Sequence, residues 1–278
     1  MLGKLLKQEF RATGRIMLPM FGALLLLTVL ANLSMRLLDR VEGGVLAVLC
    51  VLVIIAFTLG IFGVFVMTLV LMVGRFHRNL LRDEGYLMHT LPVSVHGLVS
   101  SKLLVSLVWI LASGVLVALI VLLSTFFQSG TNLSELLSQI PTWDELNRLL
   151  AAEGLSLGSL TVWAVEFLAV AIVSLLGLCL HFYAAMAMGH MFNKDKVLLS
   201  IVFFVAISIV LSILSTSLSM GVGRRYFGGL YPMTVDTFAE TVRFLHSLLH
   251  FSLIVELLKT ALLYFCTTFS LKRGLNLG

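Results

Sequence analysis

Charged side chains are scarce in this chain: only 12% of its 278 residues are Asp, Glu, Lys or Arg, whereas 59% are hydrophobic. A soluble domain carries about 25% charged residues, so this composition predicts an integral membrane protein. The net charge of +5 would suggest nucleic-acid binding in a soluble chain. Lysines and arginines in cytoplasmic loops explain it more simply here, and no nucleic-acid partner is expected.

Cysteines and catalytic motifs are also sparse. Cys50, Cys179 and Cys266 all lie inside apolar runs, so neither a disulfide nor a zinc site is expected from them. The sequence contains no G-x-x-x-x-G-K-[S/T] phosphate loop and no H-E-x-x-H motif. His181 and His190 are interpreted as packing or pore-lining residues. The chain is therefore predicted not to be an enzyme, and neither a cofactor nor a metal is expected within it.

Long apolar runs are what the sequence has in abundance, and each is long enough to cross a bilayer, which takes about 20 residues. We predict an all-α integral membrane protein, with residues 1–278 forming one transmembrane domain of six helices. The first apolar run is longer than the roughly 7–15-residue core of a signal peptide, so it is expected to be retained as a span. The predicted spans are about 16–35, 45–74, 103–127, 161–192, 197–220 and 248–270.

Three shorter helices are predicted outside these spans, and one of them is an outer helix before the sixth span that opens with a capping box of Thr237 and Glu240. Residues 1–15 alternate apolar and basic positions with helical spacing, which is typical of an amphipathic helix lying on the membrane surface. In the acidic loop 128–158, Thr142 and Glu145 form a capping box that predicts a short surface helix. With both termini inside, the inner segments hold twice as many lysines and arginines as the outer loops, which predicts cytoplasmic N- and C-termini.

The polar segment 75–102, RFHRNLLRDEGYLMHTLPVSVHGLVSSK, joins the second and third spans, and we call it the elbow. Pro92 disfavours helix at Leu91, and Ser94 is placed to start the next helix. A loop that only connected two spans could be as short as NKDK at 193–196. We therefore interpret the elbow as a cytoplasmic docking element rather than an ordinary solvated loop.

Charged residues inside the sixth span are expensive unless they are compensated. Glu256 and Lys259 are three residues apart and can meet on one helix face. They predict either a polar patch on a transport path or an ion pair within the bundle. A shorter sixth span, with Glu256 near the outer interface, remains an alternative. Glu166 is expected at the outer rim of the fourth span, without a specific role.

The sequence DEGYLMHTLPVS at 83–94, followed by Ser101 and Lys102, resembles the loop between spans 2 and 3 in membrane subunits of type-2 ATP-binding-cassette (ABC) exporters. The ending LKRGLNLG is similar to the K-K-x-L-N-L tail of the small bacterial permeases in this family, although Gly278 replaces their acidic last residue. The six-span plan matches over the whole chain.

This resemblance implies a half-transporter in the bacterial cell membrane. Two such subunits, identical or sister, would assemble with two cytoplasmic ATPase subunits, which would bind ATP and Mg²⁺. Alternating access would then export an amphiphilic, peptide-like or lipid-like substrate. In this family the loop after the second span couples to the ATPase, which implies coupling roles for Asp83, Glu84, Gly85, Tyr86, Leu87, Thr90, Leu91 and Pro92.

Two other functions stay open. A sensor or immunity scaffold would bind a peptide at its outer loops without transporting it. An ion-coupled carrier would use Glu256 and Lys259 and would need no ATPase, but the sequence lacks recognisable repeats and Gly/Pro-broken helix pairs.

Overall fold

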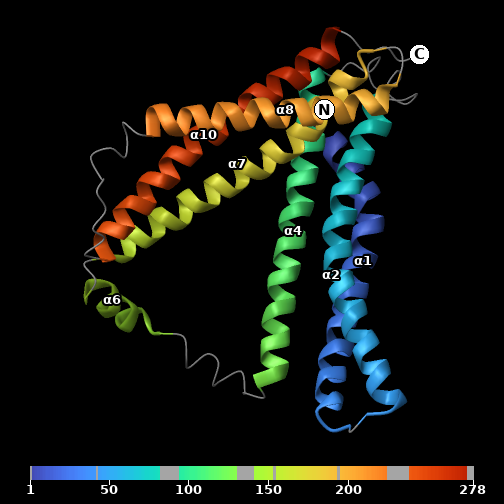
Figure 1. Cartoon of the computed structure of the whole chain (residues 1–278), viewed down its shortest axis with the longest axis vertical. Helices are drawn as coiled ribbons and strands as arrows, with labels where there is room; N and C mark the ends of the chain where they lie inside the picture. Colours follow the sequence, from blue (N-terminus) through green and yellow to red (C-terminus); the bar gives the residue numbers. More distant parts are fainter. Residues whose placement is uncertain are drawn as a thin grey trace. The chain divides into compact units, whose positions relative to one another are not determined.

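The fold was analysed from a computed structural model, which describes residues 2–41, 43–81, 94–129, 141–152, 155–192, 195–223 and 238–273. Long helices dominate these residues, and no strand occurs among them (Figure 1). The elements are α1 (Leu2–Leu38), α2 (Val45–Phe76), the π-helical turn η1 (His77–Leu81), α4 (Val95–Ser129), α6 (Trp143–Ala152), α7 (Leu157–Gly189), α8 (Lys196–Leu218), the π-helical turn η2 (Ser219–Gly223) and α10 (Phe238–Arg273).

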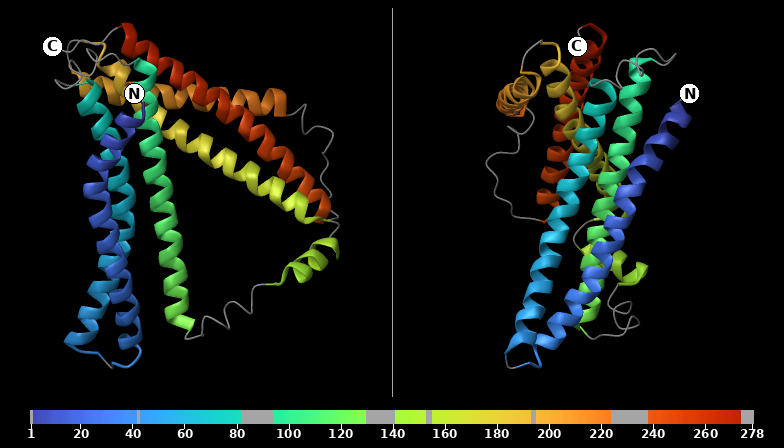
Figure 2. Two further views of the ribbon diagram at one scale, coloured as in Figure 1. Left: turned by 180° about the vertical axis from the view of Figure 1, so that it is seen from behind. Right: turned by 90° about the vertical axis from the view of Figure 1, so that its right-hand side faces the viewer.

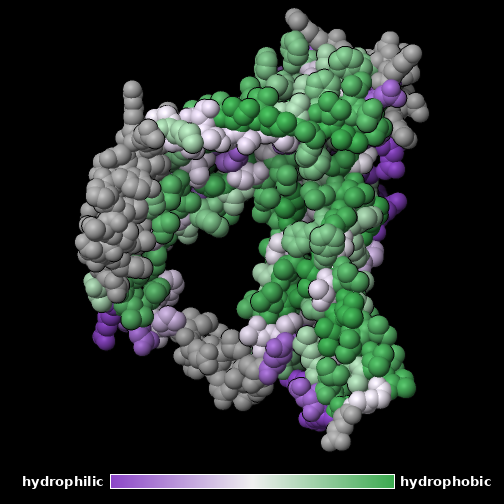
Figure 3. Space-filling view, in the orientation of Figure 1, coloured by the Kyte–Doolittle hydropathy of each residue, from purple (hydrophilic) through white to green (hydrophobic). Residues whose placement is uncertain are grey.

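Six of these helical segments are long and apolar enough to cross a membrane. They are Gly3–Leu38, Val45–Leu81, Val95–Gln128, Leu157–Gly189, Lys196–Gly221 and Phe244–Lys272. Apolar side chains dominate their visible surface (Figure 3), as expected for helices that meet lipid rather than water. The prediction of an all-α chain with six membrane-length helices is confirmed for the described residues, and it supports a multi-pass membrane protein.

Several helices extend beyond the predicted spans. Residues 2–15, expected as a separate interfacial helix, are helical but continue without a break into the first span as α1. The second helix runs through Phe76 and η1 to Leu81, and α4 begins at Val95, directly after the predicted start at Ser94. Much of the elbow is therefore helical at both ends. Its central residues 82–93, including every predicted coupling residue, lie outside the described part of the chain.

The chain groups into two compact units, and it passes between them three times. The first unit comprises residues 1–75 and 97–140, and the second comprises residues 76–96 and 141–278. Two of the crossings fall at the Arg75–Phe76 and His96–Gly97 peptide bonds, both within the elbow, and the third falls between residues 140 and 141. The prediction of one transmembrane domain rests on the sequence, in which no linker or change in composition marks these points.

The first unit is built from α1, α2 and α4, which run side by side over most of their length (Figure 2). Leu24, Val64, Leu116 and Ile120 form its buried core. Polar side chains also join the helices: Asn32 Nδ2 donates to Ser124 Oγ at 3.1 Å, and Thr68 Oγ1 lies 3.1 Å from Ser113 Oγ. Trp109 Nε1 donates to Thr13 Oγ1 at 2.7 Å. Such hydrogen bonds help hold helices together where apolar contact alone gives little advantage over lipid.

In the second unit, α7 packs against α8 and α10. The two helices α7 and α8 come close at Gly189, where an added Cβ would lie 2.6 Å from the backbone nitrogen of Ser200. His181 Nε2 lies 3.1 Å from Ser208 Oγ across the same two helices. The end of α7 therefore depends on a residue without a side chain.

Replacing Gly189 with alanine is expected to lower the free energy of unfolding by about 1–3 kcal/mol, because the new methyl group would force the two backbones apart. Thermal unfolding of the detergent-solubilised protein, followed by circular dichroism, would measure this. Gly74→Ala is the matched control, because a Cβ at Gly74 would meet nothing within 4 Å. It should be neutral or stabilise helix α2 by up to about 1 kcal/mol. Equal stability of the two variants would contradict the close contact.

Candidate functional site

A buried carboxylate in the first unit holds the two helix segments that lead into and out of the elbow. Arg75 Nε donates to Glu9 Oε2 at 2.9 Å, and Lys102 Nζ donates to Glu9 Oε1. Glu9 comes from α1, Arg75 from the last turn of α2, and Lys102 from the first turns of α4. One carboxylate group thus fastens both ends of the predicted docking element to the N-terminal helix.

Burial makes this cluster energetically important. Only 6% of Glu9 and 5% of Lys102 is exposed, and the Arg75 side chain is 19% exposed. Charged groups are stable in such a place only when their partners and hydrogen bonds are well arranged. Sequence reasoning missed Glu9, although it is the sole acidic residue among the first 38 residues of a basic and apolar segment. A single acidic residue in such a segment was the signal that could have identified Glu9 as a candidate partner for buried basic residues.

In the second unit, residues at both ends of the elbow contact α7 and α10. The ring of Phe76 stacks on Tyr183, with centroids 4.0 Å apart and planes 6° from parallel. At the other end, His96 Nδ1 lies 3.0 Å from the Tyr264 hydroxyl, and Lys272 Nζ lies 3.1 Å from His96 Nε2. A movement of the elbow would therefore reach α7 through a buried aromatic stack and α10 through a polar chain.

The residue after Phe76 adds a second contact between the elbow and α7. The ring of His77 packs edge-on against His190, with centroids 5.0 Å apart. His190 is buried at the end of α7, and its Nδ1 lies 2.9 Å from the carbonyl oxygen of Met186. His190 was predicted to be a packing or pore-lining residue, and the structure shows it packed against the base of the elbow.

Glu256 and Lys259, the predicted intramembrane residues, contact each other on α10. Lys259 Nζ donates to Glu256 Oε1 at 2.6 Å, and both side chains are about three-quarters buried. The sixth span extends from Phe244 to Lys272, which places the pair near its middle. Beside the pair, Thr260 Oγ1 donates to the carbonyl oxygen of Val173 on α7 at 3.3 Å. The two charges therefore lie near a close contact between α7 and α10.

Reversing one charge of this pair, as in Glu256→Lys or Lys259→Glu, is expected to destabilise the protein by about 3 kcal/mol, because two like charges then share one turn inside the span. The double variant Glu256→Lys/Lys259→Glu should regain most of that loss. Thermal unfolding and the yield of membrane-inserted protein would both report it. A double variant no better than either single variant would show that the two side chains act independently.

Glu166 has a more specific environment than the sequence suggested. Its two carboxylate oxygens face His246 and His250 on α10, with Oε2 lying 2.8 Å from His246 Nδ1 and Oε1 lying 3.0 Å from His250 Nε2. Sequence reasoning placed Glu166 at the outer rim without a role and did not single out the histidines. The spacing H-x-x-x-H, which puts two imidazoles on one helix face, was the missed signal.

Comparison of the chain with known proteins gives no match: no protein-family model, no curated protein and no solved structure is similar to it. The resemblance to ABC exporter subunits therefore rests on the motifs quoted above. Its function has to be argued from the chain's own residues and geometry.

Proposed function

We propose that this chain is the membrane-spanning subunit of a type-2 ABC exporter, working with a separate ATPase. The observation that carries this proposal is the way both ends of the elbow are held. Glu9 binds Arg75 and Lys102 in the first unit, whereas Phe76 and His96 contact α7 and α10 in the second. A passive connection between two spans needs no such anchoring.

The mechanism follows from this connectivity. The sequence has no phosphate-binding loop of its own, so an ATP-driven transporter built from this chain takes its energy from a partner ATPase. When ATP closes two cytoplasmic ATPase subunits, the elbows that dock on them move as well. In this chain a displacement of the elbow would pull on α1 through a buried ion cluster and on α7 and α10 through Tyr183 and Tyr264. Alternating access of the helix bundle would result.

The assembly and the membrane belong to the same proposal. Two membrane subunits, identical or sister, would sit in the bacterial plasma membrane with both termini and the elbow in the cytoplasm. The substrate would be amphiphilic, either peptide-like or lipid-like. ATP and Mg²⁺ would bind to the ATPase subunits only.

The direct test is to isolate the tagged protein from native membranes in mild detergent and identify the proteins that accompany it. A stoichiometric soluble ATPase, whose hydrolysis rate rises with substrate, would support the exporter. A folded, intact protein that reproducibly lacks an ATPase would overturn the proposal. Peptide binding without turnover would instead indicate the sensor or immunity scaffold.

The mid-span position of Glu256 and Lys259 favours one further candidate, an ion-coupled carrier. Charged groups that deep inside a span commonly belong to ion or proton pathways. Reconstitution in vesicles without any ATPase separates the two functions. Uptake driven by a proton or sodium gradient alone would support the carrier, and transport that requires ATP would support the exporter.

A further inference from the structure

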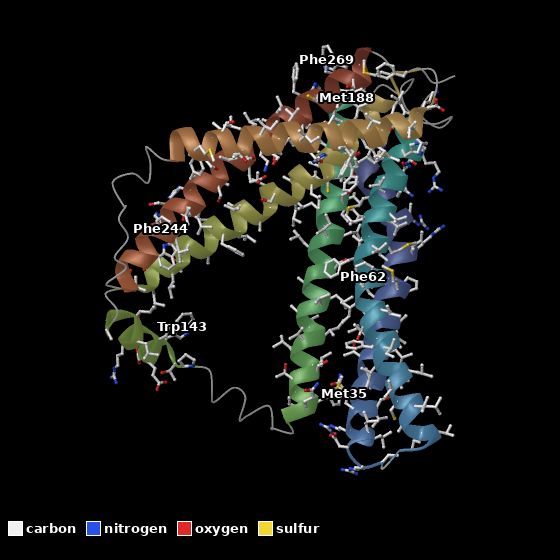
Figure 4. The ribbon with its side chains drawn as sticks, viewed as in Figure 1. Met35, Phe62, Trp143, Met188, Phe244 and Phe269 are labelled. Atoms are coloured by element: carbon white, nitrogen blue, oxygen red, sulfur yellow. The ribbon has the colours of Figure 1, made fainter. Side chains whose placement is uncertain are left out.

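The side chains of Glu166, His246 and His250 form a compact cluster between α7 and α10. Each can offer one ligand atom, and these atoms all lie within 4.8 Å of one another. His250 Nε2 lies 3.0 Å from Glu166 Oε1 and 3.2 Å from His246 Nε2. Phe244, labelled in Figure 4, marks the end of α10 near which the two histidines lie. No ionisable residue of this cluster is used by the proposed exporter mechanism.

Hydrogen bonding within the cluster is incomplete. Glu166 Oε2 and His246 Nδ1 are both buried and lie 2.8 Å apart, yet neither has a hydrogen-bond partner of suitable geometry among the described residues. A buried polar atom without a partner typically costs about 1–3 kcal/mol. At His250, a single ring nitrogen faces both a carboxylate oxygen and another imidazole nitrogen, and one N–H can be directed at only one of them. A cation bound by the three groups would account for both observations.

We propose that Glu166, His246 and His250 bind a divalent transition-metal ion of the Zn²⁺ type. Imidazole nitrogen and carboxylate oxygen are ordinary zinc ligands, and two histidines with one glutamate leave a fourth position open. Tetrahedral coordination with bonds of about 2.0–2.2 Å separates neighbouring ligand atoms by roughly 3.3–3.6 Å. One ligand atom from each of the three residues lies within 4.8 Å of the other two, so this spacing is reached by side-chain adjustments of about 1 Å.

The ligand types also indicate which metal ion would bind. Ca²⁺ and Mg²⁺ prefer sets made of oxygen ligands, whereas two imidazoles favour Zn²⁺ and its neighbours in the transition series. The Glu166 side chain is 13% exposed, but those of His246 and His250 retain 35% and 44% exposure. An ion can therefore enter from the histidine side. Its open position would take water or an anionic group.

Because the cluster lies between α7 and α10, a bound ion would connect these two helices. His246 is two residues into the sixth span, at the end far from the C-terminus, and Glu166 lies in the first third of α7. A bound ion would fasten α7 to α10 at this end. Under the orientation proposed above this end faces the outside of the cell, but the metal site itself does not depend on the exporter assignment.

The test is a Zn²⁺ titration of the purified full-length protein in lipid nanodiscs, after removal of metal with a chelator. We expect one Zn²⁺ per chain by isothermal titration calorimetry and a rise in the unfolding temperature on binding. Glu166→Gln, His246→Ala and His250→Ala should each weaken binding at least about 10-fold, since even losing a residue that only supports the ligands costs that much. Glu145→Gln, a carboxylate change at an exposed position of α6 outside the cluster, should leave the affinity unchanged.

A second measurement separates ligation from folding. In the variant His250→Cys, Co²⁺ should bind and give a thiolate-to-cobalt charge-transfer band in the near ultraviolet, which only a directly ligating residue 250 can produce. Circular dichroism would confirm that all variants keep the same helical content. Zinc affinity of the wild type equal to that of the folded His246→Ala/His250→Ala double variant would overturn the proposal, as would Co²⁺ binding by His250→Cys without the band.

Discussion

Replacing Glu9 with glutamine is expected to lower the free energy of unfolding by about 3–5 kcal/mol, the usual cost of removing one partner from a buried ion cluster. The change removes the carboxylate that compensates Arg75 and Lys102, and Lys102 is only 5% exposed. Thermal unfolding in detergent would show the loss directly. The proposal predicts an additional effect, a weaker response of transport to ATP, because the elbow would lose its link to α1.

Two further variants show whether the loss comes from the buried charges. Glu145→Gln makes the same chemical change on the exposed first turn of α6 and should change stability by no more than about 0.5 kcal/mol. Glu9→Gln combined with Lys102→Met removes one charge of each sign and should recover much of the stability, because Arg75 retains some exposure to water. If Glu9→Gln proved as harmless as Glu145→Gln, the cluster would not be what holds these helices together.

The second large effect concerns Tyr86 and Leu87 and rests on the exporter proposal. Replacing both with glutamate is expected to abolish co-purification of the ATPase. Anchor residues at protein interfaces cost about 2 kcal/mol or more when lost, which is roughly 30-fold in Kd for each residue. Burying two new carboxylates would add to that penalty. The measurement is the amount of ATPase retained per membrane subunit after affinity isolation.

The control variant changes a charge at another position that is predicted to face the cytoplasm. Lys7→Glu alters an exposed position on α1 and should retain the ATPase. Both proteins must reach the membrane fraction in equal amounts, which shows that insertion is intact. Unchanged retention of the ATPase by the Tyr86→Glu/Leu87→Glu variant would remove the elbow from the docking surface while leaving the transmembrane fold unaffected.

The number of membrane-length helices could be predicted because it depends on hydropathy, which is a local property of the chain. The apolar runs found the six spans, and the Thr142 capping box found α6, where the Glu145 amide donates to Thr142 Oγ1 at 3.4 Å. Helix ends were predicted less well. Backbone hydrogen bonds continue past the apolar residues, so α2 and η1 carry the helix on to Leu81 through polar residues.

For the candidate sites, contacts within one helix could be predicted from the sequence, but contacts between helices could not. Glu256 and Lys259 could be paired from the sequence because residues three apart in a helix are neighbours. Glu9 and Lys102 are 93 positions apart, and their meeting depends on how α1 and α4 pack, which hydropathy does not encode. For the same reason Glu166 was left without a role. Its histidine partners share a helix face with each other, but only the α7–α10 contact brings the carboxylate to them.

The arrangement of Glu256 and Lys259 within a single helix turn has a consequence for the synthesis of the protein. A charged residue at the centre of a span adds about 2.5–3.5 kcal/mol to the cost of insertion through the translocon. Because these two residues compensate each other inside α10, the centre of the helix can leave the translocon without net charge before any neighbour has packed against it. The cluster at Glu9 has no such independence, since its members lie on three helices and it can be completed only after Lys102 has left the ribosome.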